Sequence, residues 1–296
     1  MDKERLYHSI VEELTKRLGS EFNVTINEVH KTNIKLDGLS ISKVGENIAP
    51  VIYLNRYLGS AFSFDEIVAD ILNLYTNAKE KKIDFDLSSF CSFNNIKEKL
   101  FIKLVNKSMN EELLSTIPHM DFLDDFAMTF HVVVIPETNE FGSISITNSH
   151  MKMWDITTEL LYQEARLSMR KLFEISLTNI VEVIDELSEH IPDDITDNRV
   201  PAFPMWVLSN TSHLYGATGI IYEDILLDFA KEHGDFFVLF SSIHECLFVE
   251  SKKLQIDDLT RMNVEVNNTM LAPVEILGTV AYFYDSKTGL ITKNTN

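Results

Sequence analysis

The stretch of residues 205–250, MWVLSNTSHLYGATGIIYEDILLDFAKEHGDFFVLFSSIHECLFVE, decides the fold predicted for this chain. Apolar segments of strand length lie near 205–210, 215–222, 236–240, 245–250 and 279–285. Helical stripes lie near 223–233 and 256–268, so residues 205–285 predict a ββαββαβ core. Gaps of hairpin length and an apolar stripe on each helix predict one antiparallel sheet with both helices on a single face.

The residues upstream predict further helices and strands. A 3.6-residue apolar period predicts a helix over residues 3–18. Ser63 and Glu66 have the spacing of a capping box, which predicts that another helix begins there. The other predicted elements are strands over 22–29, 33–43, 126–135 and 142–147, a helix from 155 and a helix over 177–190.

This order of elements predicts an α+β fold, in which antiparallel sheet layers carry helices packed on one face. We expect two modules, an N-terminal α+β module over residues 1–120 and a C-terminal α+β module over residues 121–296. Within the second module we expect an acidic helical connection near 155–198, because carboxylates from Glu182 to Asp197 crowd its end.

The formal net charge of −19 limits the partners of this protein. A surface of this charge repels phosphate backbones, so direct binding of nucleic acid is disfavoured. Anionic membranes are disfavoured for the same reason. A protein partner is expected, and the charge suits a basic one; an acidic inhibitor that imitates nucleic acid is an alternative. The sequence does not specify the oligomeric state.

Compartment and membrane signals are both limited. Cys91 and Cys246 lie in apolar neighbourhoods and form no C-x-x-C motif, which is typical of free thiols in a reducing compartment. The N-terminus has no apolar segment of a signal peptide, and no run approaches the about 18 apolar residues of a membrane span. These features predict a cytoplasmic protein that does not cross or bind a membrane.

Three pieces of the chain together carry a resemblance. They are Asn47-Ile48-Ala49-Pro50 with Ile52-Tyr53-Leu54, the loop Ser241-Ser242-Ile243-His244-Glu245, and Asn267 followed by Pro273-x-Glu275, Tyr282 and Tyr284-Asp285. In order and spacing the chain resembles an uncharacterised family of proteins from low-GC Gram-positive bacteria, a domain of unknown function. The resemblance implies a bacterial cytoplasmic setting and no assigned activity, cofactor or partner.

The loop 241–245 is where reactive side chains crowd at a strand junction. Ser242, His244 and Glu245 supply a nucleophile, a base and an orienting carboxylate, and they are the candidate catalytic residues. In a strand, however, His244 and Glu245 point to opposite faces. There is no G-x-S-x-G motif around the serine either. The alternative is a hairpin turn whose hydroxyls cap backbone groups.

Binding and metal sites have weaker signals. Ser241, Ser242, His244, Glu245 and His213 are the candidate binding residues, because loops at strand ends present polar groups to pockets. His213, His233 and His244 belong to one predicted module, but no metal-ligand spacing occurs among the histidines, so no metal and no cofactor are predicted.

These observations favour a soluble, non-enzymatic protein-interaction or regulatory module. They leave open the alternative that the protein is an enzyme. A hydrolase that uses the Ser242–His244–Glu245 loop is the first alternative. The acidic inhibitor or nucleic-acid mimic is the second, since Glu182, Asp185 or Glu186, and Glu189 form one helical row of carboxylates.

Overall fold

The computed structural model describes residues 2–46, 49–80, 90–134, 141–188, 203–250 and 254–293. They fall into two compact units. The N-terminal unit contains the described residues up to 80, and the C-terminal unit contains those from 90 onward. The predicted boundary near residue 120 falls inside a strand of the second unit, His119–Phe122.

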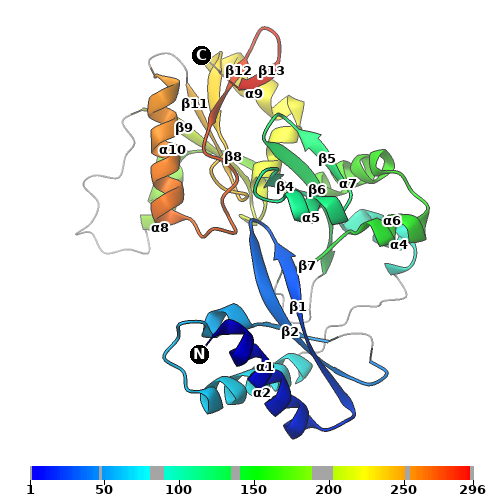
Figure 1. The fold of residues 1–296 in the computed structure, drawn as a ribbon. Coiled ribbons are helices and arrows are strands. Elements are labelled where there is room, and N and C mark those ends of the chain that lie inside the picture. The colour runs from blue at the N-terminus through cyan, green and yellow to red at the C-terminus, as the bar shows by residue number, and fades with distance from the viewer. Residues whose placement is uncertain are drawn as a thin grey trace. The chain divides into compact units, whose positions relative to one another are not determined.

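The N-terminal unit is a three-stranded antiparallel sheet with two helices. Its core joins the first helix to the sheet, since Ile10 and Leu14 meet Leu39 and Ile41, which share one strand face. The capping box is confirmed, because the Ser63 N–H donates to the Glu66 carboxylate at 2.8 Å. The elements are α1 Lys3–Leu18, β1 Phe22–Lys31, β2 Ile34–Lys43, β3 Val51–Tyr53, η1 Leu54–Tyr57 and α2 Phe64–Glu80 (Figure 1).

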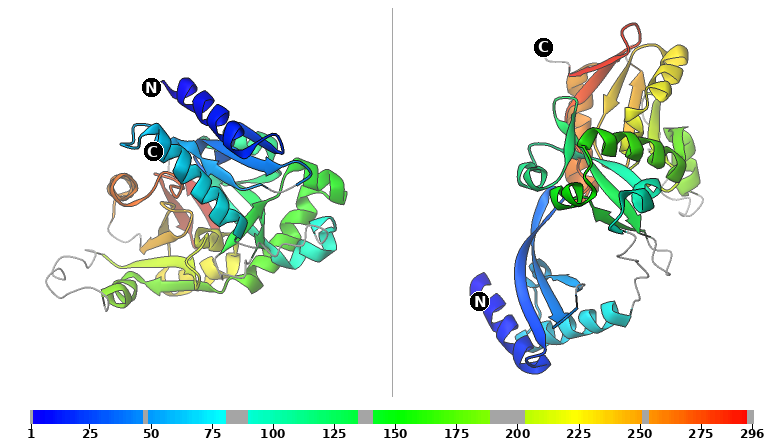
Figure 2. Two further views of the ribbon diagram at one scale, coloured as in Figure 1. Left: turned by 90° about the horizontal axis from the view of Figure 1, so that it is seen from below. Right: turned by 90° about the vertical axis from the view of Figure 1, so that its right-hand side faces the viewer.

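The helix over residues 3–18 and the two strands after it form as predicted, because each depends on a local apolar period, and the two strands pair as an antiparallel hairpin. Figure 2 shows α1 in dark blue and α2 in light blue beside this blue hairpin.

The C-terminal unit contains two antiparallel sheets. The first is organised around β6, whose neighbours are β4, β5 and β7. Its central strand is the predicted strand over 126–135, and the predicted strand from Gly142 pairs with it. The elements of this part are α4 Phe93–Ile96, η2 Lys97–Lys99, β4 Leu100–Asn106, α5 Glu111–Thr116, β5 His119–Phe122, β6 Phe126–Val134, β7 Gly142–Ser145, α6 Asn148–Trp154 and α7 Thr158–Leu172.

The second sheet has six strands in the order β13-β12-β10-β11-β9-β8, and all neighbours are antiparallel. An α+β fold with antiparallel sheets is therefore confirmed. The elements are β8 Ile175–Asn179, α8 Ile180–Ser188, β9 Met205–Asn210, η4 Gly216–Ile221, α9 Glu223–His233, β10 Phe236–Leu239, β11 Cys246–Glu250, α10 Ile256–Met270, β12 Ala281–Asp285 and β13 Leu290–Lys293.

Two predicted elements differ from the structure. The segment 215–222, predicted as a strand, is the buried 3-10 helix η4, which begins after Tyr215 in the left-handed region at φ 56°. A side chain at Gly216 would lie 2.5 Å from the Ser209 hydroxyl, so this turn packs its backbone directly against β9. The predicted helix over 177–190 begins only at Ile180, because residues before it pair with β9 as strand β8.

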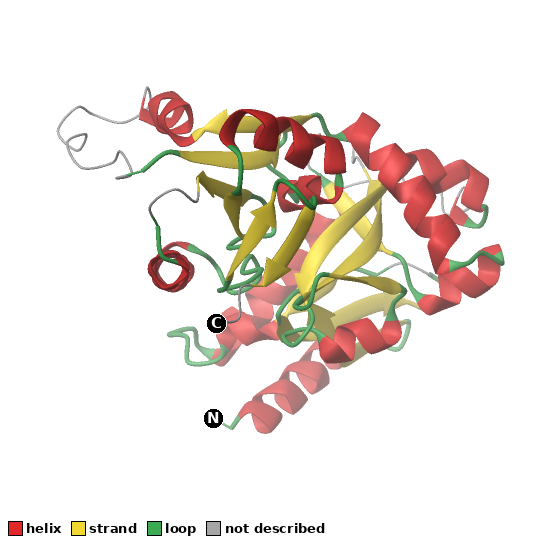
Figure 3. Cartoon of the chain, turned by 90° about the horizontal axis from the view of Figure 1, so that it is seen from above, coloured by secondary structure: helices red, strands yellow, loops and turns green. Residues whose placement is uncertain are grey.

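The placement of both helices on a single face of this sheet was wrong. Phe229 of α9 contacts Phe236 and Phe248, whereas Leu259 of α10 packs with Phe237, which points to the opposite face. All four residues of β10 are buried, so both faces of the sheet are apolar at this strand, and each face packs against other elements. Figures 1 and 3 show helices on both sides of these strands.

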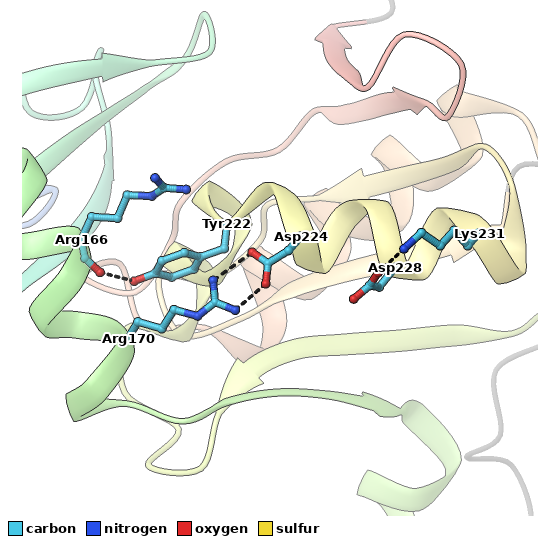
Figure 4. Close-up of polar contacts among 6 residues, drawn as sticks. All are labelled: Arg166, Arg170, Tyr222, Asp224, Asp228 and Lys231. Carbon is cyan, nitrogen blue, oxygen red and sulfur yellow. Dashed lines mark hydrogen bonds and ion pairs between the residues drawn. The ribbon is translucent and has the colours of Figure 1, made fainter.

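Helix α7 packs on β4 and is linked to the start of α9. The Tyr222 hydroxyl donates to the backbone carbonyl of Arg166 at 2.8 Å (Figure 4). Arg170 lies over the Tyr222 ring and pairs with both carboxylate oxygens of Asp224. Within the described ranges, no helix combines the length and the apolar composition needed to cross a bilayer.

Candidate functional site

A cavity of about 450 Å³ lies over the face that β8, β9 and β11 present toward α8. This volume is within the range of small-molecule sites, roughly 300–1,000 Å³. The wall combines aliphatic side chains with hydroxyls, two carboxylates and one imidazole. The described residues that line it are Ser176, Thr178, Ile180, Val183, Glu186, Val207, Ser209, His213, Glu245 and Leu247.

The strand pairing explains why these side chains share one face. Ser176 lies opposite Ser209, and Thr178 lies opposite Val207. Leu247 is the next neighbour of Val207 on β11. Because side chains alternate along a strand, every second residue of the three strands points into the cavity. Helix α8 covers this face with one stripe, Ile180, Val183 and Glu186, at spacings of three.

Glu245 brings a half-buried carboxylate to the cavity from the residue just before β11. Burial raises the pKa of Glu245, and the negative charge of Glu275 raises it further, while His213 opposes both. Among the residues that the structure describes, none forms a hydrogen bond or ion pair with this carboxylate. A partly desolvated acceptor without a donor from these residues is a group that a ligand can satisfy.

His213 is exposed at the cavity and stands on a loop built around Asn210. The Asn210 side chain is buried; its Oδ1 accepts from the N–H groups of Ser212 and Leu214 at 3.0 and 3.3 Å. Its Nδ2 donates to the Leu214 carbonyl at 2.8 Å. These bonds hold His213 in the left-handed region at φ 53°. The imidazole is therefore placed by a buried side chain on β9.

His244 does not line the cavity but supports the same loop. Its Nδ1 accepts from the backbone N–H of Tyr215 at 3.3 Å, and its Nε2 lies 3.9 Å from Oε1 of Glu275. The ring stacks on Tyr215 with centroids 5.6 Å apart. Burial lowers the pKa of His244, the charge of Glu275 opposes this, and Lys103 adds to it. The neutral imidazole is the form that can accept from Tyr215.

The two serines of the loop are buried and serve the backbone. The Ser242 hydroxyl accepts from the backbone N–H of His244 at 3.0 Å. The Ser241 carbonyl accepts from the N–H of Leu277 at 2.8 Å. Both imidazole nitrogens of His244 face groups other than Ser242, so the three candidate catalytic side chains do not form a nucleophile–base–carboxylate chain in this geometry.

The structure thus separates the five candidate binding residues. It brings Glu245 and His213 into one cavity, whereas Ser241, Ser242 and His244 are not among the residues that line it. His233 lies elsewhere: it pairs with Glu250 at 2.9 Å and stacks on Phe229 at the α9 face. The three histidines of this module therefore do not converge.

Sequence reasoning missed the three hydroxyls, and it named Glu186 only as part of an acidic helical row. Ser176 and Thr178 alternate with Leu177, which is a strand signal, but the apolar helical run that follows masked it. Ser209 sits at the end of a predicted strand, and only pairing with β8 shows that it faces a cavity. Of the predicted acidic connection, residues 189–198 lie outside the described residues, and they include the last carboxylate of the predicted row.

Comparisons with known proteins identify a family for this chain. A model of a protein family described as "Family of unknown function (DUF5688)" matches residues 3–286, which is nearly the whole chain. No curated protein matches. No solved structure matches either.

Proposed function

Because this chain belongs to the DUF5688 family, whose function is unknown, we propose a function from the site itself. The protein is a non-enzymatic regulatory module that binds a small molecule in the cavity between α8 and the strands β8, β9 and β11. The observation that carries this proposal is the cavity of about 450 Å³, in which aliphatic walls surround a few convergent polar groups. That composition is typical of ligand sites in proteins.

The same geometry favours binding over hydrolysis. The Ser242 hydroxyl is almost fully buried and engaged by the backbone of His244, so it is not presented to the cavity. Glu245 is presented to it without a hydrogen-bond donor among the described residues, which costs folding free energy that a ligand would recover.

A basic protein partner remains a prediction from the net charge of −19. Such a partner is compatible with a regulatory module, in which a bound small molecule changes the affinity for a protein.

The proposal is tested by filling the cavity. Val183 points into it from α8, and Val181, on the same helix, is 38% exposed and does not line it. We would screen a library of small polar and amphipathic molecules by ligand-observed NMR against the natural chain, Val183→Trp and the matched control Val181→Trp. Thr178→Tyr fills the cavity from β8 and provides a second blocking variant.

We expect some molecules to bind the natural chain and Val181→Trp, and to lose binding in both blocking variants while the melting temperature stays within a few degrees. A library without binders, or binders that are indifferent to both blocking substitutions, would overturn the proposal.

A further inference from the structure

The charges of the cavity wall select the kind of ligand. Two carboxylates, Glu186 and Glu245, line the cavity, and none of its described lining residues is a lysine or an arginine. Glu275 adds negative charge near Glu245. The field inside a concave, partly desolvated site is stronger than at an open surface, so this cavity attracts a cation and repels a phosphate or a carboxylate.

The hydrogen-bond acceptors point to a primary ammonium group. Ser209 lines the cavity, and its hydroxyl donates its proton to the His244 carbonyl at 2.9 Å, so its oxygen can only accept a further hydrogen bond. Ser176 lies opposite Ser209 in the strand register, and the Glu245 carboxylate stands one residue before β11 on the same face. An ammonium group has three N–H donors and no acceptor, which matches a set of two hydroxyls and one carboxylate.

The rest of the wall disfavours quaternary ammonium groups, sugars and metal ions. No Phe, Tyr or Trp side chain occurs among the described residues that line the cavity, so the large ring faces that bind quaternary ammonium groups and the flat faces of sugars are missing there. The ligand atoms of Glu186, His213 and Glu245 do not form a group within 4.8 Å of one another, as three ligands of a metal ion would. The aliphatic side chains are Ile180, Val183, Val207 and Leu247, and they suit an alkyl chain.

We propose that the cavity binds a primary aliphatic amine as its ammonium ion, with the nitrogen at Glu245, Ser209 and Ser176 and the alkyl chain against Val183 and Leu247. This inference rests on the proposed function, since it names the ligand class of the same cavity. The alkylammonium group has two possible sources, a free small amine or the lysine side chain of a partner protein.

The test compares three ligands of equal length: pentylamine, pentan-1-ol and pentanoate, titrated into the ¹⁵N-labelled full chain at pH 7.5. We expect pentylamine to shift amide signals of β8, β9 and α8, and the alcohol and the carboxylate to bind at least tenfold more weakly. Glu245→Gln should weaken pentylamine binding at least tenfold, and Glu182→Gln, on an exposed residue of α8 outside the cavity, less than twofold.

The outcomes separate this inference from the proposed function. If the alcohol or the carboxylate binds as tightly as the amine, and Val183→Trp abolishes that binding, the cavity is a ligand site and the amine assignment is wrong. Equal affinity of the natural chain and Glu245→Gln for pentylamine would overturn the assignment as well. If none of the three binds, the amine assignment fails, and the library screen decides the proposed function alone.

A second arm distinguishes the source of the amine. A lysine-containing peptide and the same peptide with an acetylated lysine are titrated in parallel. Binding of the free-lysine peptide at least tenfold more tightly than pentylamine, and its loss on acetylation, assigns the ammonium group to a protein partner. Equal or weaker binding of the peptide assigns it to a free amine.

Discussion

The backbone N–H of Tyr215 donates a hydrogen bond to Nδ1 of His244, with 3.3 Å between the two nitrogens. Tyr215 is held in the left-handed region at φ 56°, where a side chain with a Cβ atom is strained. The bond therefore fixes the end of the loop that carries His213 to the cavity. A histidine that suggested catalysis in the sequence acts here as a support for its neighbours.

His244 makes the stability of the protein sensitive to acid. Burial holds the pKa of His244 below its usual value, so the unfolded chain takes up a proton first as the pH falls. The stability that neutral His244 contributes is fully present above a pH of about 6.5, which is the pKa in the unfolded chain. It is lost as the pH falls toward the lower pKa of the folded state. Buried His131, whose pKa is lowered well below its usual value by burial and by Lys103, acts in the same direction.

We expect His244→Asn, which keeps an acceptor near the position of Nδ1 but does not titrate, to lose less stability between pH 7.5 and 5.5 than the natural chain. His244→Leu should cost about 1–2 kcal/mol more than the asparagine variant at pH 7.5, because the Tyr215 N–H then has no acceptor. Urea unfolding at both pH values measures this. Identical pH dependence in the natural chain and His244→Asn would contradict it.

Glu245 should cost the protein stability at neutral pH. Its pKa is raised by burial and by the charge of Glu275, so the folded state binds its proton more tightly than the unfolded chain does. The contribution of Glu245 to the free energy of unfolding therefore rises as the pH falls through the pKa of the folded state. The rise continues to a pH of about 4.3, which is the pKa in the unfolded chain. Glu245→Gln should raise the free energy of unfolding at pH 7.5 by about 0.5–1 kcal/mol, while Glu182→Gln changes it little. A loss of stability in Glu245→Gln would show that the carboxylate is satisfied in the folded protein.

Asp125 ties the C-terminal hairpin to the first sheet of its unit. Its carboxylate accepts from Lys293 at 2.8 and 2.7 Å and from the Tyr282 hydroxyl at 2.8 Å. Burial alone would raise its pKa, but the hydrogen bonds from Lys293 and Tyr282 outweigh burial and lower it. Asp125→Asn should cost about 1–3 kcal/mol at pH 7, since these bonds involve charged groups.

The neighbouring exposed Asp124 provides the control, and Asp124→Asn should have little effect. The pKa of Asp125 is lower in the folded state than in the unfolded chain. Its contribution to stability is therefore fully present above a pH of about 3.9, the unfolded pKa, and is lost as the pH falls through the pKa of the folded state. The difference between Asp125→Asn and the natural chain in chemical denaturation should therefore shrink below a pH of about 3.9. A difference that stays constant in acid would contradict the charge-based explanation.

Gly216 should not tolerate a side chain. A Cβ atom there would lie 2.6 Å from the His244 carbonyl oxygen and 2.7 Å from the Ser209 Cα, both of which are backbone atoms. Gly216→Ala should destabilise the protein by about 2 kcal/mol or more, as overpacking does. Gly219→Ala, in the same 3-10 helix, would meet side-chain atoms alone, the nearest of them Leu208 Cδ1 at 3.3 Å, and should cost under about 1 kcal/mol. Equal melting temperatures of the two variants would disprove the close packing.

The contact of α7 with α9 offers a comparison of a buried hydroxyl with an exposed ion pair. Tyr222→Phe removes the bond to the Arg166 carbonyl, and we expect a loss of about 1 kcal/mol. Asp224→Asn breaks the ion pair with Arg170, but both side chains are about half exposed, so a smaller loss of about 0.5 kcal/mol is expected. Thermal unfolding in low and high salt checks this, since only the Asp224 effect should diminish with salt.

The sequence by itself determined the elements that rest on a local pattern. The helix Lys3–Leu18 follows from its 3.6-residue apolar period, and the strands Phe22–Lys31 and Ile34–Lys43 from alternation and a short turn. The capping box at Ser63 and the strand Phe126–Val134 have the same local origin. The α+β class and the membership of a family of unknown function also followed, because element order and residue spacing are properties of the chain alone.

The tertiary structure alone decided which faces and which distant residues meet. Helices α9 and α10 lie on opposite faces of the six-stranded sheet, because Phe236 and Phe237 point to opposite faces and are both buried. The apolar period of a helix does not say which face of the sheet it will bury. Ser176, Ser209 and Glu245 share a cavity only because β8 and β11 flank β9. The order of strands in a sheet depends on hydrogen bonds and burial between segments far apart in the chain. A local sequence pattern therefore does not predict which strands are neighbours.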